Sequence, residues 1–515
     1  MKRITKTRNQ LRRRRITIPK KAGAWSYACL FVITITGFFP LLLSQSVWSK
    51  HDHVERSAYT SDQKWQDAWK IESLQKNDPL SITSYWIEQA LPLPTSILHY
   101  GINITLHLIA AILMLKMLQR LDLHGAWAAT MVFAVHPTTV QTLFWPGYRH
   151  EIVGLIAILT AFNCGMGRGG RTYYIKYVLL TVVASIIHPA ALVIPFISIL
   201  CNFKKESKIR LEHINYFLPV LCLCLFIGLW IAGSNNNEFR SSADNELLQT
   251  AGQNINFFFK QAFFPINPSL FYNINIKTTY TPSTDIFLLP FLVFIPLLLI
   301  ATFNHHKEWA RAIIFGLLSY LLLLIPGLIT RGAFIDGAIA HEDHFHYIAL
   351  PAIISLIICG AANFAHRVKG AAILAWRTVM PILIIVELTI TASFAYSVSK
   401  PEKMWKQIIT TWPESTLPKI AYIDTLTVNN NPNISNGVLI NLLEEILEKE
   451  PNNVSIRIIY AGALRQGREF GNAYKQYQRV LRESEPSQEF IKQAIDFYEQ
   501  IGKQWEADKI RKLLK

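Results

Sequence analysis

Charged and imidazole side chains occur at five places in this sequence where an apolar segment begins or ends. The first set follows the earliest apolar segment, in WSKHDHVERS, where Asp52 stands between His51 and His53. A carboxylate flanked by imidazoles at a membrane surface is suited to accept a proton as a general base. The same residues are also compatible with an ordinary solvated loop, and the local sequence leaves both interpretations open.

The second set lies in HPTTVQTLFWPGYRHE, residues 136–151, between two apolar segments. Its ionisable side chains are His136, Arg149, His150 and Glu151. The His-Pro pair predicts the end of a helix, because proline disfavours the helical conformation in the residue before it. Ionisable groups at a membrane edge are costly and indicate a functional site. Helix capping, with the neighbouring Trp and Tyr as interfacial anchors, is the structural alternative.

The other three sets lie in or beside further apolar segments. Asn103 and His107 are one helical turn apart and share a face, which favours hydrogen bonding between helices. His188 precedes a proline in SIIHPAALVIP, at a break between two short apolar segments. The stretch AHEDHFHYIALP, residues 340–351, includes Asp343, His344 and Tyr347. It could ligate a metal, but its spacing matches no strong zinc pattern. We assign no metal ligand and leave a divalent metal cofactor open.

The elements that must position these residues are predicted to be membrane helices. The chain has 515 residues, of which 51% are hydrophobic, and runs of roughly 18 or more apolar residues are the signature of membrane spans. The sequence therefore predicts an all-α, polytopic membrane helix bundle of about eleven spans. We place them near residues 24–48, 96–116, 126–145, 151–165, 176–188, 190–203, 214–233, 285–302, 311–328, 347–365 and 378–396.

The distribution of basic residues predicts the orientation of these spans. The net charge is +16, and ten Lys and Arg but no acid fall in the first 21 residues. A basic arm before an apolar segment marks a cytoplasmic end and favours contact with anionic membrane lipids. We expect no nucleic-acid partner, which would call for a folded basic face. With residues 1–23 inside, nearly every short basic loop of the core, 24–397, is also inside, and the outer loops are 49–95, 234–284 and 329–346.

The last hundred residues are polar and helix-forming, and they follow a predicted linker at 398–417. Gly467 and Gly502 are 35 residues apart, and Ala473 and Ala507 are 34 apart. This spacing is the period of tetratricopeptide repeats. The sequence predicts an extracytoplasmic helical repeat domain at 418–515, on the outer side because the number of spans is odd.

Several short motifs resemble, in order along the chain, those of the GT-C glycosyltransferases, in particular the TMTC-like branch with C-terminal tetratricopeptide repeats. HPTTVQTLFWPGYRHEIVGL is similar to the family's HPxxxEaVaWisgRkdlL, with Gln141 in place of Glu. YGINITLH resembles HLxNLLLH, and FFFKQAFFPINPSLFY resembles YLxxxFxPxxLxxxY. IHPAALVIP and EDHFHYIALP are similar to SKPxxVTLP and ADRYxYLP, with His188 replacing Lys and His344 replacing Arg. The family's usual Asp-Asp pair in the first outer loop is reduced here to Asp52.

The resemblance implies transfer of a sugar from a polyprenyl-phosphate carrier to a protein or glycan acceptor on the outer face. It assigns Asp52 as the general base, and Arg149, His188, His344 and Arg331 as groups that stabilise the carrier phosphate. The residues implied to support this outer-face site are His51, His53, His136, Glu151, Asp343, Tyr347, Asn103 and His107.

Two other classes of function compete with this one. A non-catalytic membrane scaffold would use the repeat domain to recruit partners for envelope assembly. A transporter would contain inverted repeats of spans, and the sequence contains none that we detect. Because the core is compact and the repeat array short, we favour a bacterial inner membrane over the endoplasmic reticulum.

Overall fold

The structure is a computed structural model of the chain, and it divides into two compact units. The first contains most residues up to Lys400, and the second consists mainly of Pro401–Lys515. The structure describes residues 23–44, 79–92, 94–145, 148–166, 171–206, 218, 220–221, 255–263, 265, 268–270, 272–274, 285–329, 334–335, 338–341, 343–428, 436–483 and 488–512.

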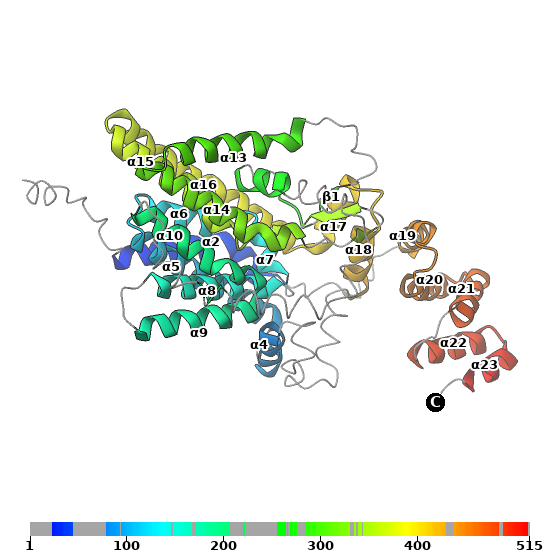
Figure 1. Cartoon of the computed structure of the whole chain (residues 1–515). Coiled ribbons are helices and arrows are strands. Elements are labelled where there is room, and N and C mark those ends of the chain that lie inside the picture. The colour runs from blue at the N-terminus through cyan, green and yellow to red at the C-terminus, as the bar shows by residue number, and fades with distance from the viewer. Residues whose placement is uncertain are drawn as a thin grey trace, which may run out of the picture. The chain divides into compact units, whose positions relative to one another are not determined.

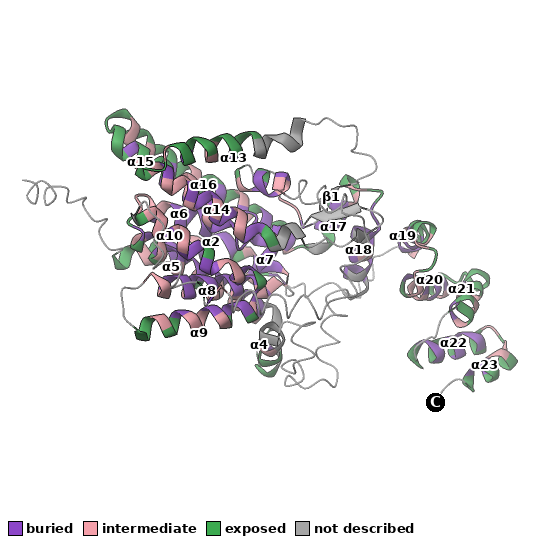
Figure 2. Ribbon diagram, viewed as in Figure 1, coloured by how far each residue is buried: buried purple, intermediate pink, exposed green. Residues whose placement is uncertain are grey.

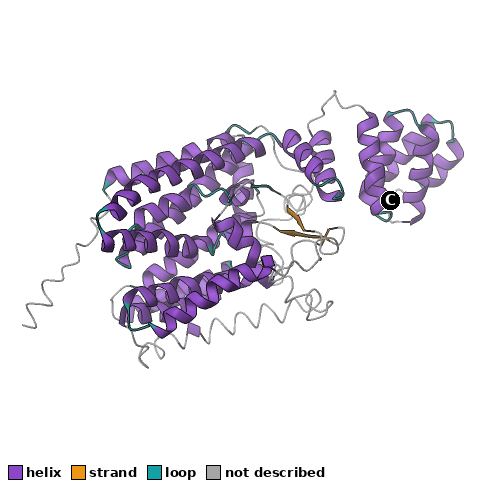
Figure 3. Ribbon diagram, turned by 90° about the horizontal axis from the view of Figure 1, so that it is seen from above, coloured by secondary structure: helices purple, strands orange, loops and turns teal. Residues whose placement is uncertain are grey.

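The first unit is a bundle of helices, which confirms the prediction of an all-α architecture at this level (Figure 1). Helices α2 and α16 pack together, as do α5 with α8, α6 with α15, α8 with α9, and α14 with both α10 and α15. Figure 3 shows these helices lying roughly parallel to one another. The helices are α2 (Ala24–Leu42), α4 (Pro79–Ala90), α5 (Thr95–Arg120), α6 (Ala126–Ala134), α7 (Thr139–Phe144), α8 (Arg149–Gly165), α9 (Arg171–Ile187), η3 (Pro189–Val193), α10 (Ile194–Glu206), α13 (Asp285–Phe303), α14 (Glu308–Ile329), η4 (Asp343–His346), α15 (Leu350–Val368) and α16 (Ala371–Val398).

Three short strands depart from the all-α prediction: β1 (Tyr272–Ile274), β2 (Phe334–Ile335) and β3 (Ala338–His341). Strand β1 pairs with β3 in antiparallel register, so that Tyr272 lies opposite His341. Both strands fall in stretches that the sequence assigned to outer loops. Segments this short contain too little alternation to be predicted as strands, and their pairing satisfies backbone N–H and C=O groups that would otherwise need other partners.

Within the described residues, five helices are long and apolar enough to cross a membrane, and they coincide with five of the eleven predicted spans. They are Ala24–Leu42, Ile97–Arg120, Glu308–Ile325, Leu350–Val368 and Ala371–Val398. The predicted span at 126–145 is not one helix, because the chain breaks between α6 and α7 at residues 135–138. Most of the predicted span at 214–233 lies outside the described residues. The count of eleven therefore stays a prediction.

Helix α16 illustrates how these helices divide between interior and exterior faces. Its buried residues include Thr391 and Phe394. Figure 2 shows exposed residues along the helices at the periphery of the bundle. In water such apolar exposure would be unfavourable, whereas lipid tails solvate it. The large exposed apolar side chains of α16 are Leu374, Val379, Ile382, Ile385 and Val386.

The second unit is a series of helices that pack mainly on their sequence neighbours. The predicted linker, 398–417, is occupied largely by a helix that belongs to this unit and packs on the next one. The helices are α17 (Pro401–Thr411), α18 (Thr416–Val428), α19 (Asn436–Lys449), α20 (Val454–Gln466), α21 (Phe470–Glu483), α22 (Gln488–Gln500) and α23 (Gln504–Arg511).

The residues that repeat in the sequence occupy equivalent places in two helix pairs of this unit. Gly467 follows α20 and Gly502 follows α22, while Ala473 and Ala507 lie in the second helices, α21 and α23. Both alanines are fully buried in one apolar core, which also includes Phe497. A side chain larger than Ala would need the packing at these positions to open, which gives the repeat a physical basis.

Within the first unit, Gly125 sets the close contact between α6 and α15. It precedes α6 with a φ of 80°, a conformation in which a residue with a Cβ is strained. A Cβ there would lie 2.6 Å from the Cβ of Ala362 and 3.3 Å from the carbonyl oxygen of Ile358. The position therefore requires glycine for both conformation and space.

We expect Gly125→Ala to lower the free energy of unfolding by about 1–3 kcal/mol, because it adds backbone strain and a clash. Thermal unfolding of the purified chain in detergent measures this. Gly101→Ala is the matched control, since a Cβ at Gly101 meets nothing within 4 Å and alanine favours a helix. Equal unfolding midpoints for the two variants would contradict the assignment.

Candidate functional site

Polar side chains from distant parts of the first unit gather around α7 and the beginning of α8. Helix α7 packs on α5, α8 and η4, and α8 packs on α4 and η3. Most side chains that the sequence singled out are buried there. They form four groups of contacts: one around Arg149, one around Glu151, one that closes the break between α6 and α7, and one that joins α7 to η4.

Arg149, the first residue of α8, is buried and donates from all three guanidinium nitrogens. Its Nε donates to Asn103 Oδ1 at 2.7 Å, and its Nη1 donates to Ser84 Oγ at 2.6 Å and to the Glu88 carboxylate. Its Nη2 is 2.8 Å from His99 Nδ1. The guanidinium is therefore held by α4 and α5 at once.

Glu88 supplies the negative charge that compensates Arg149. The carboxylate is 1% exposed, and its second oxygen lies 3.8 Å from His99 Nδ1. Burial alone would raise the pKa of Glu88, but the neighbouring His99 and the Arg149 charge outweigh it and hold the pKa below its ordinary value. Glu88 is therefore ionised at neutral pH.

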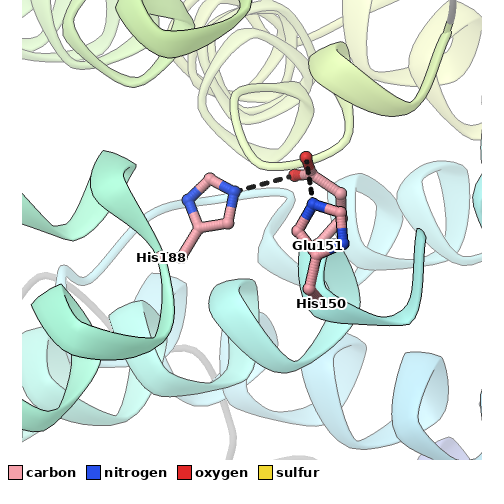
Figure 4. Close-up of side chains that lie close together, drawn as sticks. All are labelled: His150, Glu151 and His188. Atoms are coloured by element: carbon pink, nitrogen blue, oxygen red, sulfur yellow. Dashed lines mark ion pairs between the residues drawn. The ribbon is translucent and has the colours of Figure 1, made fainter. Parts of the chain in front are cut away.

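Glu151 forms the second group with two imidazoles. His150 Nε2 lies 3.4 Å from one carboxylate oxygen, and His188 Nε2 lies 3.3 Å from the other. Figure 4 shows both rings directed at the carboxylate. Gly154, one turn further along α8, leaves room for His188, since a Cβ there would be 2.8 Å from the Cβ of His188.

The break between α6 and α7 is closed by side chains from other helices. His107 Nε2 lies 3.2 Å from the carbonyl oxygen of Ala134, and His107 Nδ1 lies 2.7 Å from the Tyr347 hydroxyl. The carbonyl acceptor indicates that Nε2 carries the hydrogen, so Nδ1 accepts from Tyr347. Thr391 donates to the carbonyl oxygen of Val135 at 2.6 Å. These contacts satisfy carbonyls that a helix end leaves unpaired.

Two other predicted residues also have defined roles at this break and beside it. Asn103 donates to the carbonyl oxygen of Leu143 at 3.0 Å while it accepts from Arg149, so it joins α5, α7 and α8. His136 Nδ1 lies 2.8 Å from Thr138 Oγ1. The expected hydrogen bonding between helices is thus present at Asn103 and His107.

Gln141 joins α7 to two segments that are more than a hundred residues away in the sequence. Its Nε2 donates to the carbonyl oxygen of Leu270 at 3.0 Å, and its Oε1 accepts from the backbone N–H of His344 at 3.1 Å. The side chain is fully buried. Only an amide offers a donor and an acceptor here, because an ionised carboxylate cannot donate. Glutamine at position 141 is therefore consistent with these contacts.

The 3-10 helix η4 places its two imidazoles in different surroundings. His344 stacks on Tyr148 with ring centroids 3.6 Å apart. His346 Nε2 lies 3.2 Å from the Tyr320 hydroxyl, and its ring stacks on Phe258. Burial lowers the pKa of His346 to about 3, so this imidazole is neutral at physiological pH.

Nine of the thirteen predicted site residues lie in the described part of the chain, and their role as a site stays a prediction. His51, Asp52, His53 and Arg331 lie outside the described residues, so the position of the proposed general base stays a prediction. Within the described part, Arg149, Asn103, His107, Tyr347, His136, Asp343 and His344 are buried around α7, and Glu151 and His188 contact each other.

Sequence reasoning missed Glu88, His99 and Ser84, the partners of Arg149. Only His99 has a local signal, because it stands one turn before Asn103 on α5. Glu88 and Ser84 lie on α4, inside the stretch that the sequence assigned to an outer loop.

The histidine-rich stretch at 340–351 contains no set of three potential metal ligands among the side chains that the structure describes. Such a set does occur, in the described residues, at His150, Glu151 and His188. The imidazole spacing along 340–351 places His344 against Tyr148 and His346 against Tyr320, on different neighbours. Among the described side chains, potential ligand atoms therefore converge at the start of α8.

No family model matches the chain, and no curated protein matches it in sequence.

We expect Gln141→Glu to lower the free energy of unfolding by about 2 kcal/mol or more. The substitution leaves the carbonyl oxygen of Leu270 without its donor and buries a new charge. Thermal unfolding in detergent measures the effect, and Gln119→Glu, a half-exposed glutamine on α5, serves as the control. A Gln141→Glu variant as stable as the control would exclude the bridging role.

We expect the buried pair Arg149–Glu88 to show strong energetic coupling. Glu88→Gln and Arg149→Met each leave one buried group unpaired and should cost about 3–5 kcal/mol. The double variant should be less destabilised than the sum of the two by about 1–3 kcal/mol. The exposed pair Arg367–Glu308, 3.6 Å apart, provides a control cycle in which the coupling should be about 1 kcal/mol or less.

The same pair predicts a dependence of stability on pH. Because the pKa of Glu88 is lowered from its ordinary value of 4.5, its contribution is fully present above that value and is lost as the pH falls through the folded pKa. The native chain should therefore lose stability below about pH 4.5 more steeply than Glu88→Gln. Parallel stability profiles for the two proteins would contradict this.

Proposed function

We propose that this chain is an integral-membrane glycosyltransferase that transfers a sugar from a polyprenyl-phosphate carrier to a protein or envelope glycan. The proposed location is a bacterial inner membrane, with the N-terminus in the cytoplasm and the C-terminal unit outside. The observation that carries the proposal is the position of Arg149. This cation is buried at the start of α8, among side chains from the motifs that resemble the GT-C family.

Spatial convergence adds to the order of the motifs as support. Five motif residues are far apart in the sequence: Asn103, Gln141, Arg149, His344 and Tyr347. Contacts between them and their close neighbours join α5, α7, α8 and η4. A set of motifs matched by chance would have no reason to meet at one place. Polar groups clustered where apolar helices end are suited to bind a phosphate whose lipid tail lies between helices.

In the proposed reaction, Asp52 removes the proton from the acceptor hydroxyl as it attacks the anomeric carbon of the sugar. The carbon–oxygen bond to the carrier phosphate breaks, and the phosphate leaves with the electron pair. Arg149, assisted by His188, His344 and Arg331, stabilises the charge that develops on the leaving phosphate. A carboxylate general base contributes about 10²–10⁴-fold to such a step.

Glu88 sets a condition on this mechanism. Its carboxylate already occupies a donor of Arg149, and two anions on one guanidinium would repel each other. A phosphate must therefore displace Glu88 or bind to the nitrogens on the opposite edge, Nε and Nη2, in place of Asn103 and His99. Arg149 then changes partners between the free and the bound state.

The C-terminal unit supports a second candidate, the non-catalytic scaffold. It has a core of its own, formed by residues from α18 to α23, and its repeated helix pairs suit tetratricopeptide-like recognition of a protein. In the leading proposal this unit binds the acceptor. In the alternative it recruits partners for envelope assembly, and the membrane core serves as an anchor.

We expect Asp52→Asn to reduce sugar transfer by about 10²-fold or more while carrier binding stays unchanged. The measurement uses the full chain in liposomes with a panel of polyprenyl-phosphate sugars labelled in the sugar. Asp67→Asn, in the same predicted loop, is the matched control. If Asp52→Asn leaves transfer and cell phenotype intact while deletion of 418–515 abolishes the phenotype, the scaffold is the better description.

A further inference from the structure

Three potential metal ligands converge on one point at the start of α8. His150 and Glu151 lie in its first turn, and His188 lies immediately before η3. The Nε2 or Nδ1 of each imidazole and an oxygen of the carboxylate lie within 4.8 Å of one another. The two rings are nearly parallel, with an angle of 14° between their planes, and one nitrogen of each ring is directed at the carboxylate (Figure 4).

The nitrogen–oxygen separations in this group are compatible with metal ligands as well as with ion pairs. The two nitrogen–oxygen distances are 3.4 and 3.3 Å, whereas charge-assisted hydrogen bonds between nitrogen and oxygen measure about 2.7–2.9 Å. Ligand atoms about 2.0–2.1 Å from a tetrahedral zinc ion lie about 3.3 Å from one another. The two nitrogen–oxygen separations, which run to different oxygens of the Glu151 carboxylate, are therefore close to the spacing of zinc ligands.

The three ligands differ in how far they are buried. The side chains of Glu151 and His188 are 4% and 7% exposed, while that of His150 is 31% exposed. Gly154 allows His188 to pack directly on α8. Two ligands are thus fixed by packing, and the third lies where an ion could enter from the solvent.

One contact must change when an ion binds. His188 Nδ1 accepts from the backbone N–H of Ala190 at 3.1 Å, so in this state Nε2 carries the ring hydrogen. Coordination through Nε2 moves that hydrogen to Nδ1, and the Ala190 hydrogen bond is lost. The site therefore gives up one hydrogen bond on loading, which weakens its affinity but leaves the ligand set intact.

We propose that His150, Glu151 and His188 form a site for a divalent transition metal of the zinc class. Two imidazoles and one carboxylate favour zinc and its neighbours over magnesium or calcium, which prefer oxygen ligands alone. Three protein ligands leave a fourth position for water, as in catalytic zinc sites. The site does not depend on the sugar-transfer proposal, because metal binding is measured without a donor.

The test uses the full-length chain in detergent, without a polyhistidine tag and after treatment with EDTA. Zn²⁺ is titrated in competition with a chromogenic chelator, and Co²⁺ is titrated while its absorption spectrum is recorded. We expect one Zn²⁺ per chain at this site and the intense visible Co²⁺ bands of a low-coordinate complex with nitrogen and oxygen ligands. Glu151→Gln and His150→Ala should each weaken the binding about 10-fold or more. His305→Ala with His306→Ala, which removes two exposed imidazoles, should leave it unchanged.

Thermal unfolding with and without Zn²⁺ distinguishes loss of the metal site from poor folding of a variant. Zn²⁺ should raise the unfolding temperature of the native chain, because a ligand that binds only the folded state stabilises it. It should not raise that of His150→Ala, which lacks one of the three ligands. Two results would overturn the proposal: native chain that binds no Zn²⁺ at about 100 μM, or variants that bind it as tightly as the native chain.

Discussion

The guanidinium of Arg149 is a full charge buried inside a predominantly apolar helix bundle, and it has to be compensated within the protein. An isolated buried ion would cost many kcal/mol. The guanidinium can be buried here because it is hydrogen-bonded to or in contact with Glu88, Ser84, His99 and Asn103. These partners come from α4 and α5. Arg149 thereby joins the start of α8 to the end of α4 and the first turns of α5. Glu151 lies two residues after Arg149 on α8, so these contacts also position the Glu151 group.

A second constraint comes from the break between α6 and α7. Carbonyl groups at a helix end have no partner in the helix, and lipid cannot supply one. His107 and Thr391 close this break from two other helices. The side chains that satisfy these backbone carbonyls also border the polar region where the apolar helices end. The structural and the functional interpretations of these polar residues are therefore compatible.

Much of the fold followed from local properties of the sequence. The five long apolar helices lie where apolar runs predicted them, and Pro137 ends α6 where the His-Pro pair indicated an end. The repeat spacing placed Ala473 and Ala507 at equivalent positions in the second unit. The expected pairing of Asn103 and His107 with other helices is also present. In contrast, the single span expected at 126–145 is two helices. Mean hydropathy is averaged over a window longer than the four-residue break, so it detects the apolar composition but not the break.

By itself, the sequence determined which segments are apolar helices, where proline interrupts them, and which residue types could do chemistry. Only the tertiary structure decided which of these residues meet. Arg149 and Asn103 are 46 residues apart, Gln141 and His344 are 203 apart, and His107 and Tyr347 are 240 apart. No periodicity encodes such pairs, because they depend on how helices pack and rotate against one another. For the same reason, the sequence could not predict that the carboxylate partner of Arg149 is Glu88, which lies on a helix without a motif. Nor could it predict that His188, which is distant in the sequence, contacts Glu151.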